Sequence, residues 1–287
     1  MKKSLAILLV TPMAILSLAL LSCCTTPTLE PLDENVQIEG DHCTLDGDVL
    51  RPLTVADKCP VAIIFHGLTG NRREAHLDAI ADSLYSAGVA VVRFDFNGHG
   101  KSGGEFVDMT LTNEMVDARK VFAYVSSLPW VDTERIAIVG HSQGGLIGGV
   151  LGGELGDAVR CLVLLSPAAC IHTMGLRGDM FGSRFDPSDI PPYIEFWGGS
   201  HLGREYLLSA QQMDVLSLTS PYKGPVMIVQ GMNEDWTLKE DSMKYTEILR
   251  SVQYNSLTGF THCYGEDVSV PAALTKDFIV EKFSSSK

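Results

Sequence analysis

Short apolar runs alternate along the chain with longer segments whose apolar residues recur at helical spacing. The short runs, rich in branched side chains, lie at 61–65, 89–94, 136–139, 161–165 and 226–229. The longer segments lie at 74–87, 112–127 and 142–155. Continuous hydrophobicity in the short runs indicates strands covered on both faces. Strands joined in turn by helices predict right-handed crossovers and the α/β class, with a mostly parallel sheet flanked by helices.

Two regions depart from this alternation. Residues 36–54 are expected to form an antiparallel hairpin ahead of the parallel strands. From about 169 to 213 the β/α rhythm stops, although aromatic residues such as Phe181, Trp197 and Tyr206 continue. Long insertions in compact domains usually serve a function, so this one is predicted to be a lid over an active site. An insertion without a function is the alternative.

The N-terminal segment has the pattern of an export signal. Lys2 and Lys3 precede an uncharged, mostly apolar run that ends in Leu20-Leu21-Ser22-Cys23. A basic start, an apolar run and a small residue before the cut predict a signal peptide over 1–22. The last four residues look like a lipobox, which makes Cys23 the candidate lipidation site. An uncleaved transmembrane anchor is the alternative, because the run is nearly long enough to span a bilayer.

These boundaries predict an exported bacterial lipoprotein, anchored at the periplasmic or outer-surface side of a membrane. Residues 23–35 are polar with two prolines and are interpreted as a tether. Residues 36–287 have the size of a single α/β domain. The lipid anchor is then the expected membrane contact, and the oligomeric state is left open.

Charge and cysteine content exclude some functions. The formal net charge is −13, which argues against nucleic acid as a partner, since phosphates require patches of Lys and Arg. Neither the cysteines nor the histidines have a recognisable ligand spacing, so neither a metal nor another cofactor is predicted. In an exported chain a Cys43–Cys59 disulfide is an open alternative. The run Asp95–Ser102 resembles a phosphate-binding loop, but Asp95 stands where its first glycine is required.

The segment Gly140-His-Ser142-Gln-Gly144 follows a predicted strand and opens a predicted helix. Such a sharp turn strains the serine backbone and requires glycines beside it. It exposes the hydroxyl at the end of the strand, at the N-terminus of the next helix. Ser142 is therefore the predicted nucleophile.

A serine hydroxyl needs a general base and an acid that orients it. His262 comes after the last expected strand and before the final helix, where the order Ser…acid…His needs its base. Glu234 and Asp235 follow the strand at 226–229, and only one of them can face His262. The backbone N–H groups of Leu68 and Gln143 are the expected oxyanion donors.

These motifs resemble the cinnamoyl or feruloyl esterases of the α/β-hydrolase fold. The resemblance runs from about His66 to the C-terminus, and its most distinctive stretch is Arg93-Phe-Asp-Phe-Asn-Gly-His-Gly100. It implies cofactor-free cleavage of hydroxycinnamic esters beneath a small inserted lid. Carried over by position, the acid falls on Glu234, which we prefer to Asp235. The same resemblance assigns Trp197 and Tyr206, and more weakly Asp179, to contacts with the substrate.

The sequence thus predicts a serine carboxylic-ester hydrolase acting through an acyl-enzyme. Its expected substrates are small-molecule or oligosaccharide esters of plant origin. The same fold and triad also serve acetyl and lipid esterases, thioesterases and serine peptidases, which stay open as alternatives. A lipoprotein that uses the pocket only for binding is a further alternative.

Overall fold

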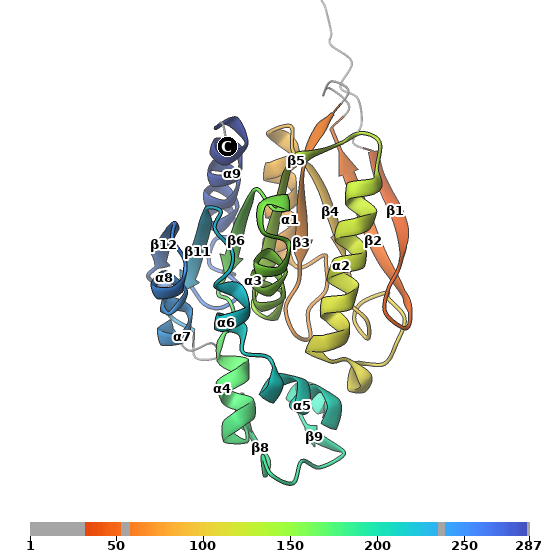
Figure 1. The fold of residues 1–287 in the computed structure, drawn as a ribbon, viewed down its shortest axis with the longest axis vertical. Helices are drawn as coiled ribbons and strands as arrows, with labels where there is room; N and C mark the ends of the chain where they lie inside the picture. Colours follow the sequence, from red (N-terminus) through yellow and green to blue (C-terminus); the bar gives the residue numbers. More distant parts are fainter. Residues whose placement is uncertain (1–31, 53–57, 235–238, 286–287) are drawn as a thin grey trace, which may run out of the picture. The chain divides into compact units, whose positions relative to one another are not determined.

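The computed structural model describes residues 32–52, 58–234 and 239–285. Within these ranges one eight-stranded sheet forms the centre of the domain (Figure 1). From edge to edge its strands are β1 (Leu32–Glu39), β2 (Thr44–Arg51), β4 (Ala90–Phe94), β3 (Cys59–Phe65), β5 (Val131–His141), β6 (Cys161–Leu165), β11 (Val226–Gly231) and β12 (Val252–Leu257).

Six neighbouring strands of this sheet are mutually parallel, namely β4, β3, β5, β6, β11 and β12, and β1 and β2 add antiparallel pairs at one edge. Every residue of β3, β4, β6 and β11 is buried, as continuous apolar runs covered on both faces require. The predicted α/β class, the five predicted strands and the leading hairpin are confirmed. β12 is an edge strand whose residues are only partly buried, so its sequence carries a weaker signal.

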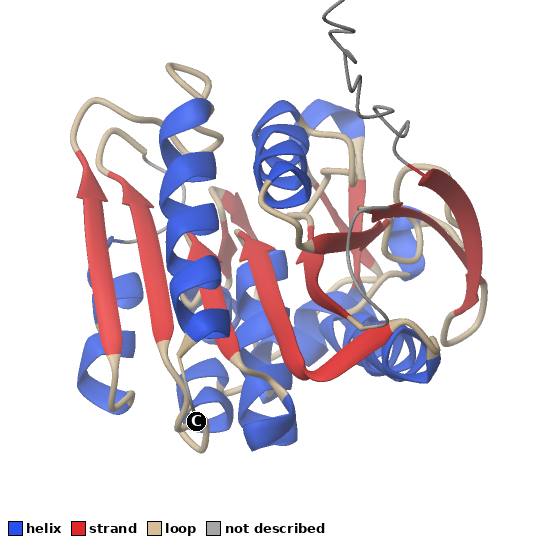
Figure 2. Cartoon of the chain, turned by 90° about the horizontal axis from the view of Figure 1, so that it is seen from above, coloured by secondary structure: helices blue, strands red, loops and turns tan. Residues whose placement is uncertain are grey.

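Helices cover both faces of the sheet (Figure 2). On one face α1 (Ala75–Ser86) and α9 (Ser269–Ser284) enclose an apolar core with side chains such as Ile64 and Val163. On the other face α2 (Leu111–Ser127) and α3 (Gln143–Leu155) pack over the remaining core, with the short α6 (Val215–Thr219) against α3. The smaller elements at the β12 edge are α7 (Lys239–Met243) and α8 (Tyr245–Ile248).

The insertion between β6 and α6 forms a separate layer beyond the ends of the central strands, at the bottom of Figure 1. It consists of α4 (Cys170–Arg177), β7 (Asp179–Met180), β8 (Ser183–Arg184), β9 (Tyr193–Glu195), β10 (His201–Gly203) and α5 (Arg204–Gln212). Its apolar residues Ile194, Leu202 and Leu207 are buried in the same core that underlies α2 and α3. The insertion is therefore packed onto the body of the domain.

Some predictions fall at or beyond the limits of the described residues. The signal peptide and Cys23 lie outside them. β1 begins at Leu32, inside the segment interpreted as a tether, because residues 32–35 pair with 48–51 of β2. Among the described cysteines Cys43 and Cys59 are both free thiols, so the structure lacks the bridge considered between them. None of the helices in the described ranges is long and apolar enough to cross a membrane.

Candidate active site

Ser142 occupies a strained turn between β5 and α3. Its backbone has φ 55° and ψ −118°, a conformation that a residue with a side chain adopts only at an energetic cost. A Cβ atom at Gly140 would lie 2.2 Å from the Gly144 carbonyl oxygen, and one at Gly144 would lie 2.4 Å from the His66 oxygen. Gly140 therefore lets β5 approach α3 closely, and Gly144 lets α3 approach the end of β3.

The loops after β11 and β12 bring Glu234 and His262 together. Nδ1 of His262 is hydrogen-bonded to Oε2 of Glu234, and the Glu234 side chain is fully buried. This bond fixes the ring orientation, so that Nε2 is the nitrogen on the side away from the carboxylate. Asp235 lies outside the described residues. The structure thus places Glu234, the residue preferred from the sequence, beside the candidate base.

Ser142 and His262 line one pocket. The loop after β3 contributes Gly67, Leu68 and Thr69 to its wall. A Cβ atom at Gly67 would lie 2.9 Å from the Ser142 Cβ, so this loop packs directly on the serine. Gln143 is the first residue of α3, and the N–H groups of a first helical turn have no intrahelical acceptor. Both predicted oxyanion donors are therefore in chain segments that adjoin Ser142.

His66 holds the loop that presents Leu68. Its Nε2 accepts a hydrogen bond from the Phe96 N–H at 2.9 Å, so Nδ1 carries the proton and donates to the Gly67 oxygen at 2.8 Å. Complete burial, together with the neighbouring His99, lowers the pKa of His66 to about 3. This histidine is therefore neutral and supports the pocket wall without exchanging protons.

The side chain of Gln143 holds the start of α3 in place through two buried hydrogen bonds. Its Nε2 donates to Oε2 of Glu114 at 2.9 Å, and its Oε1 accepts from the Tyr206 hydroxyl at 2.7 Å. Burial raises the pKa of Glu114 well above its ordinary value. Tyr206 is fully buried and does not line the pocket, so the structure differs here from the predicted contact with the substrate. Its phenol instead connects α5 of the insertion to α3.

Of the two other predicted substrate contacts in the insertion, Trp197 lines the pocket and Asp179 does not. Trp197 lines the pocket and stacks on Phe196, with ring centroids 4.5 Å apart. Asp179 accepts from the Gly182 N–H at 2.8 Å and lies 3.6 Å from the Arg184 guanidinium. It is not part of the pocket lining, which departs from the weak prediction that it receives a substrate phenol.

The pocket also contains residues that the sequence did not single out. Phe181 lies opposite Trp197, with ring centroids 5.4 Å apart. Glu74, His141 and Cys263 complete the lining. Glu74 immediately precedes α1. Its place at the end of the loop after β3, near the predicted active site, was the feature of the sequence that could have pointed to it. Phe181 had no such signal, because the insertion has no regular pattern.

Comparisons with known proteins place this geometry in context. The model of the family described as serine aminopeptidase, S33, matches residues 57–184. A structure of Est1E from Butyrivibrio proteoclasticus with ferulic acid bound is 33% identical, with a TM-score of 0.84. That alignment covers 87% of this chain and 100% of the Est1E chain.

Two curated relatives match over shorter regions. The quorum-quenching protein AidA of Acinetobacter baumannii is 32% identical over 40% of this chain, and a monoacylglycerol lipase of Mycolicibacterium smegmatis is 30% identical over 44%. The chain spans less than half the length of these relatives, 37% and 43%.

The sheet, the elbow and the pocket define the class of protein, an α/β hydrolase with a serine at the nucleophile turn. Because the likeness to Est1E covers that whole structure at 33% identity, the chain belongs to the esterase family of α/β hydrolases that includes Est1E. The resemblance to cinnamoyl and feruloyl esterases drawn from the sequence is confirmed at this level.

Proposed function

We propose that this chain is a serine carboxylic-ester hydrolase that releases hydroxycinnamic acids of the ferulic type from plant-derived esters. The observation that carries the proposal is the hydrogen bond between Glu234 and His262, because His262 lines the same pocket as Ser142. A buried carboxylate on Nδ1 is the arrangement that makes a histidine an effective base toward a serine hydroxyl.

In the proposed reaction His262 takes the Ser142 proton as the serine oxygen attacks the ester carbonyl carbon. The N–H groups of Leu68 and Gln143 then stabilise the oxyanion, each typically by about 3 kcal/mol. When the C–O bond breaks, the alcohol leaves with the proton from His262. Water, deprotonated by the same ring, hydrolyses the acyl-enzyme and restores Ser142.

Specificity for an aromatic acid is supported by two aromatic side chains that line the same pocket as Ser142. Phe181 and Trp197, both from the insertion, supply flat apolar surface on which a phenyl ring can stack. The bound ferulic acid in the structure of Est1E points in the same direction. We propose that the insertion, about 169–213, is the lid of this site.

A panel of substrates tests the proposal. Methyl ferulate, a short acetyl ester, a long-chain acyl ester and an anilide are compared by kcat/KM. We expect methyl ferulate to be the best substrate and Ser142→Ala to abolish its hydrolysis. Preference for the long acyl ester would make the protein a lipid esterase, and preference for the anilide a peptidase.

A fluorophosphonate probe separates catalysis from mere binding. We expect it to label the native protein and a Ser188→Ala control, in which an exposed serine is removed. Labelling should be lost in Ser142→Ala. An unlabelled native protein would favour a lipoprotein that only binds ligands.

We also propose that the chain is exported and carries a lipid on Cys23. The support is the basic start, the apolar run and the Leu-Leu-Ser-Cys sequence described above. Mass spectrometry of the membrane-bound protein should show a chain that begins at Cys23 and carries the added mass of a lipid, and Cys23→Ala should lose both features. An unmodified native chain that still contains residues 1–22 would favour an uncleaved anchor.

A further inference from the structure

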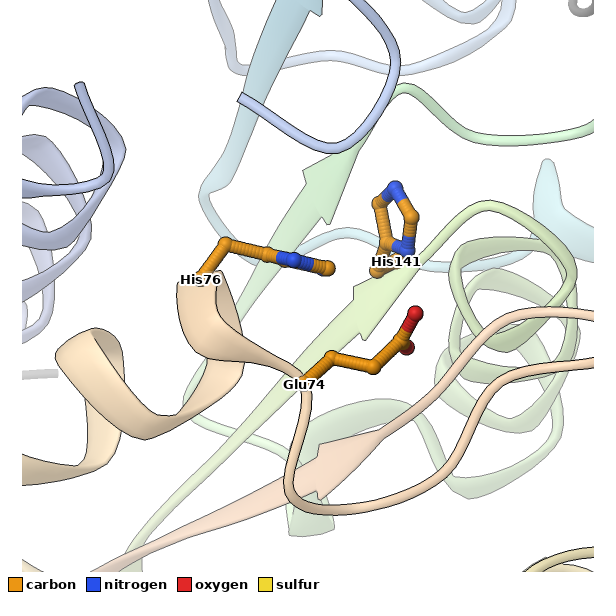
Figure 3. Close-up of side chains that lie close together, drawn as sticks. All are labelled: Glu74, His76 and His141. Atoms are coloured by element: carbon orange, nitrogen blue, oxygen red, sulfur yellow. The ribbon is translucent and has the colours of Figure 1, made fainter. Parts of the chain in front are cut away.

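Three side chains converge beside the pocket, and each has a buried polar atom that forms no hydrogen bond to a described residue. Figure 3 shows the ring of His76 extending toward that of His141, with the carboxylate of Glu74 below His141. Their nearest ligand-type atoms all lie within 4.8 Å of one another. Among the described residues, Oε2 of Glu74, Nε2 of His76 and Nδ1 of His141 have no hydrogen-bond partner although they are buried.

The proton positions make this arrangement unusual. Nε2 of His141 lies 3.0 Å from the His262 carbonyl oxygen, and a carbonyl only accepts, so Nε2 carries the proton. Nδ1 of His141 therefore presents a lone pair toward Glu74 and His76. A buried polar atom without a partner destabilises the fold, and here three such atoms lie together.

From this geometry we propose that Glu74, His76 and His141 form a binding site for a divalent transition-metal ion of the Zn²⁺ type. Two imidazole nitrogens and one carboxylate oxygen are ligands that Zn²⁺ and its first-row neighbours accept, whereas Mg²⁺ and Ca²⁺ prefer oxygen alone. Glu74 and His141 line the pocket that holds Ser142. The proposed site therefore adjoins the pocket, and water or a substrate oxygen is the expected fourth ligand.

The surroundings favour the ligating form of each histidine. Burial lowers the pKa of His76 to about 4 and holds that of His141 well below its ordinary value. Both rings are thus neutral near pH 7 and bind a cation without first releasing a proton. Burial also raises the pKa of Glu74 to about 7, which a nearby cation would reverse.

Small movements suffice to close the site. Tetrahedral coordination at about 2.0–2.1 Å places ligand atoms about 3.4 Å apart, so the separations, all within 4.8 Å, must shrink by at most about 1.4 Å. Glu74 has the longest side chain of the three and is only partly buried. Its carboxylate packs on Gly70, where a Cβ atom would lie 2.5 Å from Oε2.

Occupancy should inhibit ester hydrolysis. The rings of His141 and His262 have centroids 4.7 Å apart. A divalent charge bound to the neighbouring His141 ring disfavours the imidazolium that forms on His262 during acyl transfer. Binding can be measured without any substrate, so failure of the metal site and failure of the proposed esterase activity are distinguishable.

The test is a titration of the full-length chain, freed of metal with EDTA, with Co²⁺ and then Zn²⁺. We expect one equivalent of Co²⁺ to give the visible absorption of a four-coordinate site, and Zn²⁺ to displace it. Glu74→Gln and His76→Asn should each weaken binding about tenfold or more. Urea unfolding of both variants establishes that they are folded.

Two controls separate this cluster from other donors. Cys263→Ser removes the thiol that lines the same pocket, and His201→Asn removes an exposed histidine of the insertion. Both should bind Co²⁺ as the native chain does. The proposal is overturned if the native chain binds no stoichiometric Co²⁺, if binding survives both ligand substitutions, or if either control abolishes it. In the first case the cluster is a proton-sharing network closed by a protonated Glu74.

Discussion

Two buried polar clusters share one short segment of the chain and differ in how completely their atoms are paired. At Arg72 the guanidinium contacts the carboxylates of Asp46, Asp48 and Asp95, all of them buried. Two residues later, Glu74 begins the second cluster with His76 and His141, where a ligand-type atom of each residue lacks a partner.

The difference reflects what each cluster does. The Arg72 cluster joins the hairpin to the loop after β4, because Arg72 contacts Asp46 and Asp48 of β2 as well as Asp95. Asp95 also accepts from the backbone N–H groups of Arg72 and Lys101 at 2.8 and 2.9 Å. Although burial opposes it, the bonds and charge of Arg72 hold the pKa of Asp48 below its usual value. Fully paired charges fix a structure, whereas unpaired atoms around a pocket are available to a ligand.

The largest expected effect is a loss of activity with little change in stability, when the carboxylate that pairs with His262 is replaced. Glu234→Gln keeps an acceptor oxygen but removes the charge that stabilises the imidazolium. We expect kcat/KM for methyl ferulate to fall about 10⁴-fold, with a change in unfolding free energy under about 1.5 kcal/mol. Steady-state kinetics and urea unfolding measure the two quantities.

Glu247→Gln, an exposed carboxylate on α8, is the matched control and should retain full activity. Asp235→Asn completes the comparison. If Glu234→Gln keeps activity within tenfold while Asp235→Asn abolishes it, the acid is Asp235 and the register argument fails.

Arg72→Met should show the opposite behaviour. It leaves three buried carboxylates without their central cation, and breaking such a cluster costs about 3–5 kcal/mol. Asp48 adds a dependence on pH, because its pKa is lower in the folded protein than in the unfolded chain. The stability that this shift contributes is present above the unfolded pKa and is lost as pH falls through the folded pKa. Urea unfolding at pH 7 and in acid measures both effects.

The control is Arg250→Met, which removes an exposed arginine. Equal stability of Arg72→Met and the control would mean that the three carboxylates take up protons at little cost, and the contrast between the clusters would disappear.

The sequence predicted those parts of the molecule that depend on local pattern. Strands such as β3 and β6 are continuous apolar runs, and the elbow at Ser142 is encoded by Gly140 and Gly144. Each of these features is decided within a few neighbouring positions. Glu234 was preferred to Asp235 from its register in the family resemblance, and the structure places it against His262.

The parts that were missed depend on contacts between distant residues. The third member of the Glu74–His76 cluster is His141, more than sixty positions away, so no ligand spacing was visible. Tyr206 was assigned to the substrate by its place in the insertion, but the fold buries it against Gln143. The distinctive run after Arg93 is a turn around Asp95, where Gly100 has φ 52° and a Cβ would lie 2.1 Å from the carboxylate.

Glu114 offers a smaller test of how pairing controls stability. Its raised folded pKa means that the folded state holds a proton that the unfolded chain releases near pH 4.5. This stabilisation is complete below pH 4.5 and is lost as pH rises through the folded pKa. In Glu114→Gln the neutral amide never ionises, so unfolding free energy should fall less steeply above pH 4.5, by at most about 1.4 kcal/mol per pH unit. Glu247→Gln should keep the native slope, and parallel curves for both variants would contradict the assignment.

The smallest expected effect concerns the aromatic wall of the pocket. Trp197→Ala removes a ring that contacts Phe181 and Phe196, and such aromatic contacts are worth about 0.5–1.5 kcal/mol. We expect about a fivefold loss of kcat/KM for methyl ferulate, because a phenyl ring loses its stacking partner, and less than a twofold loss for an acetyl ester. Leu176→Ala, an exposed apolar residue of the insertion, should change neither value. An equal loss for both esters would mean that Trp197 only packs the lid, and the aromatic preference would then have to arise elsewhere in the pocket.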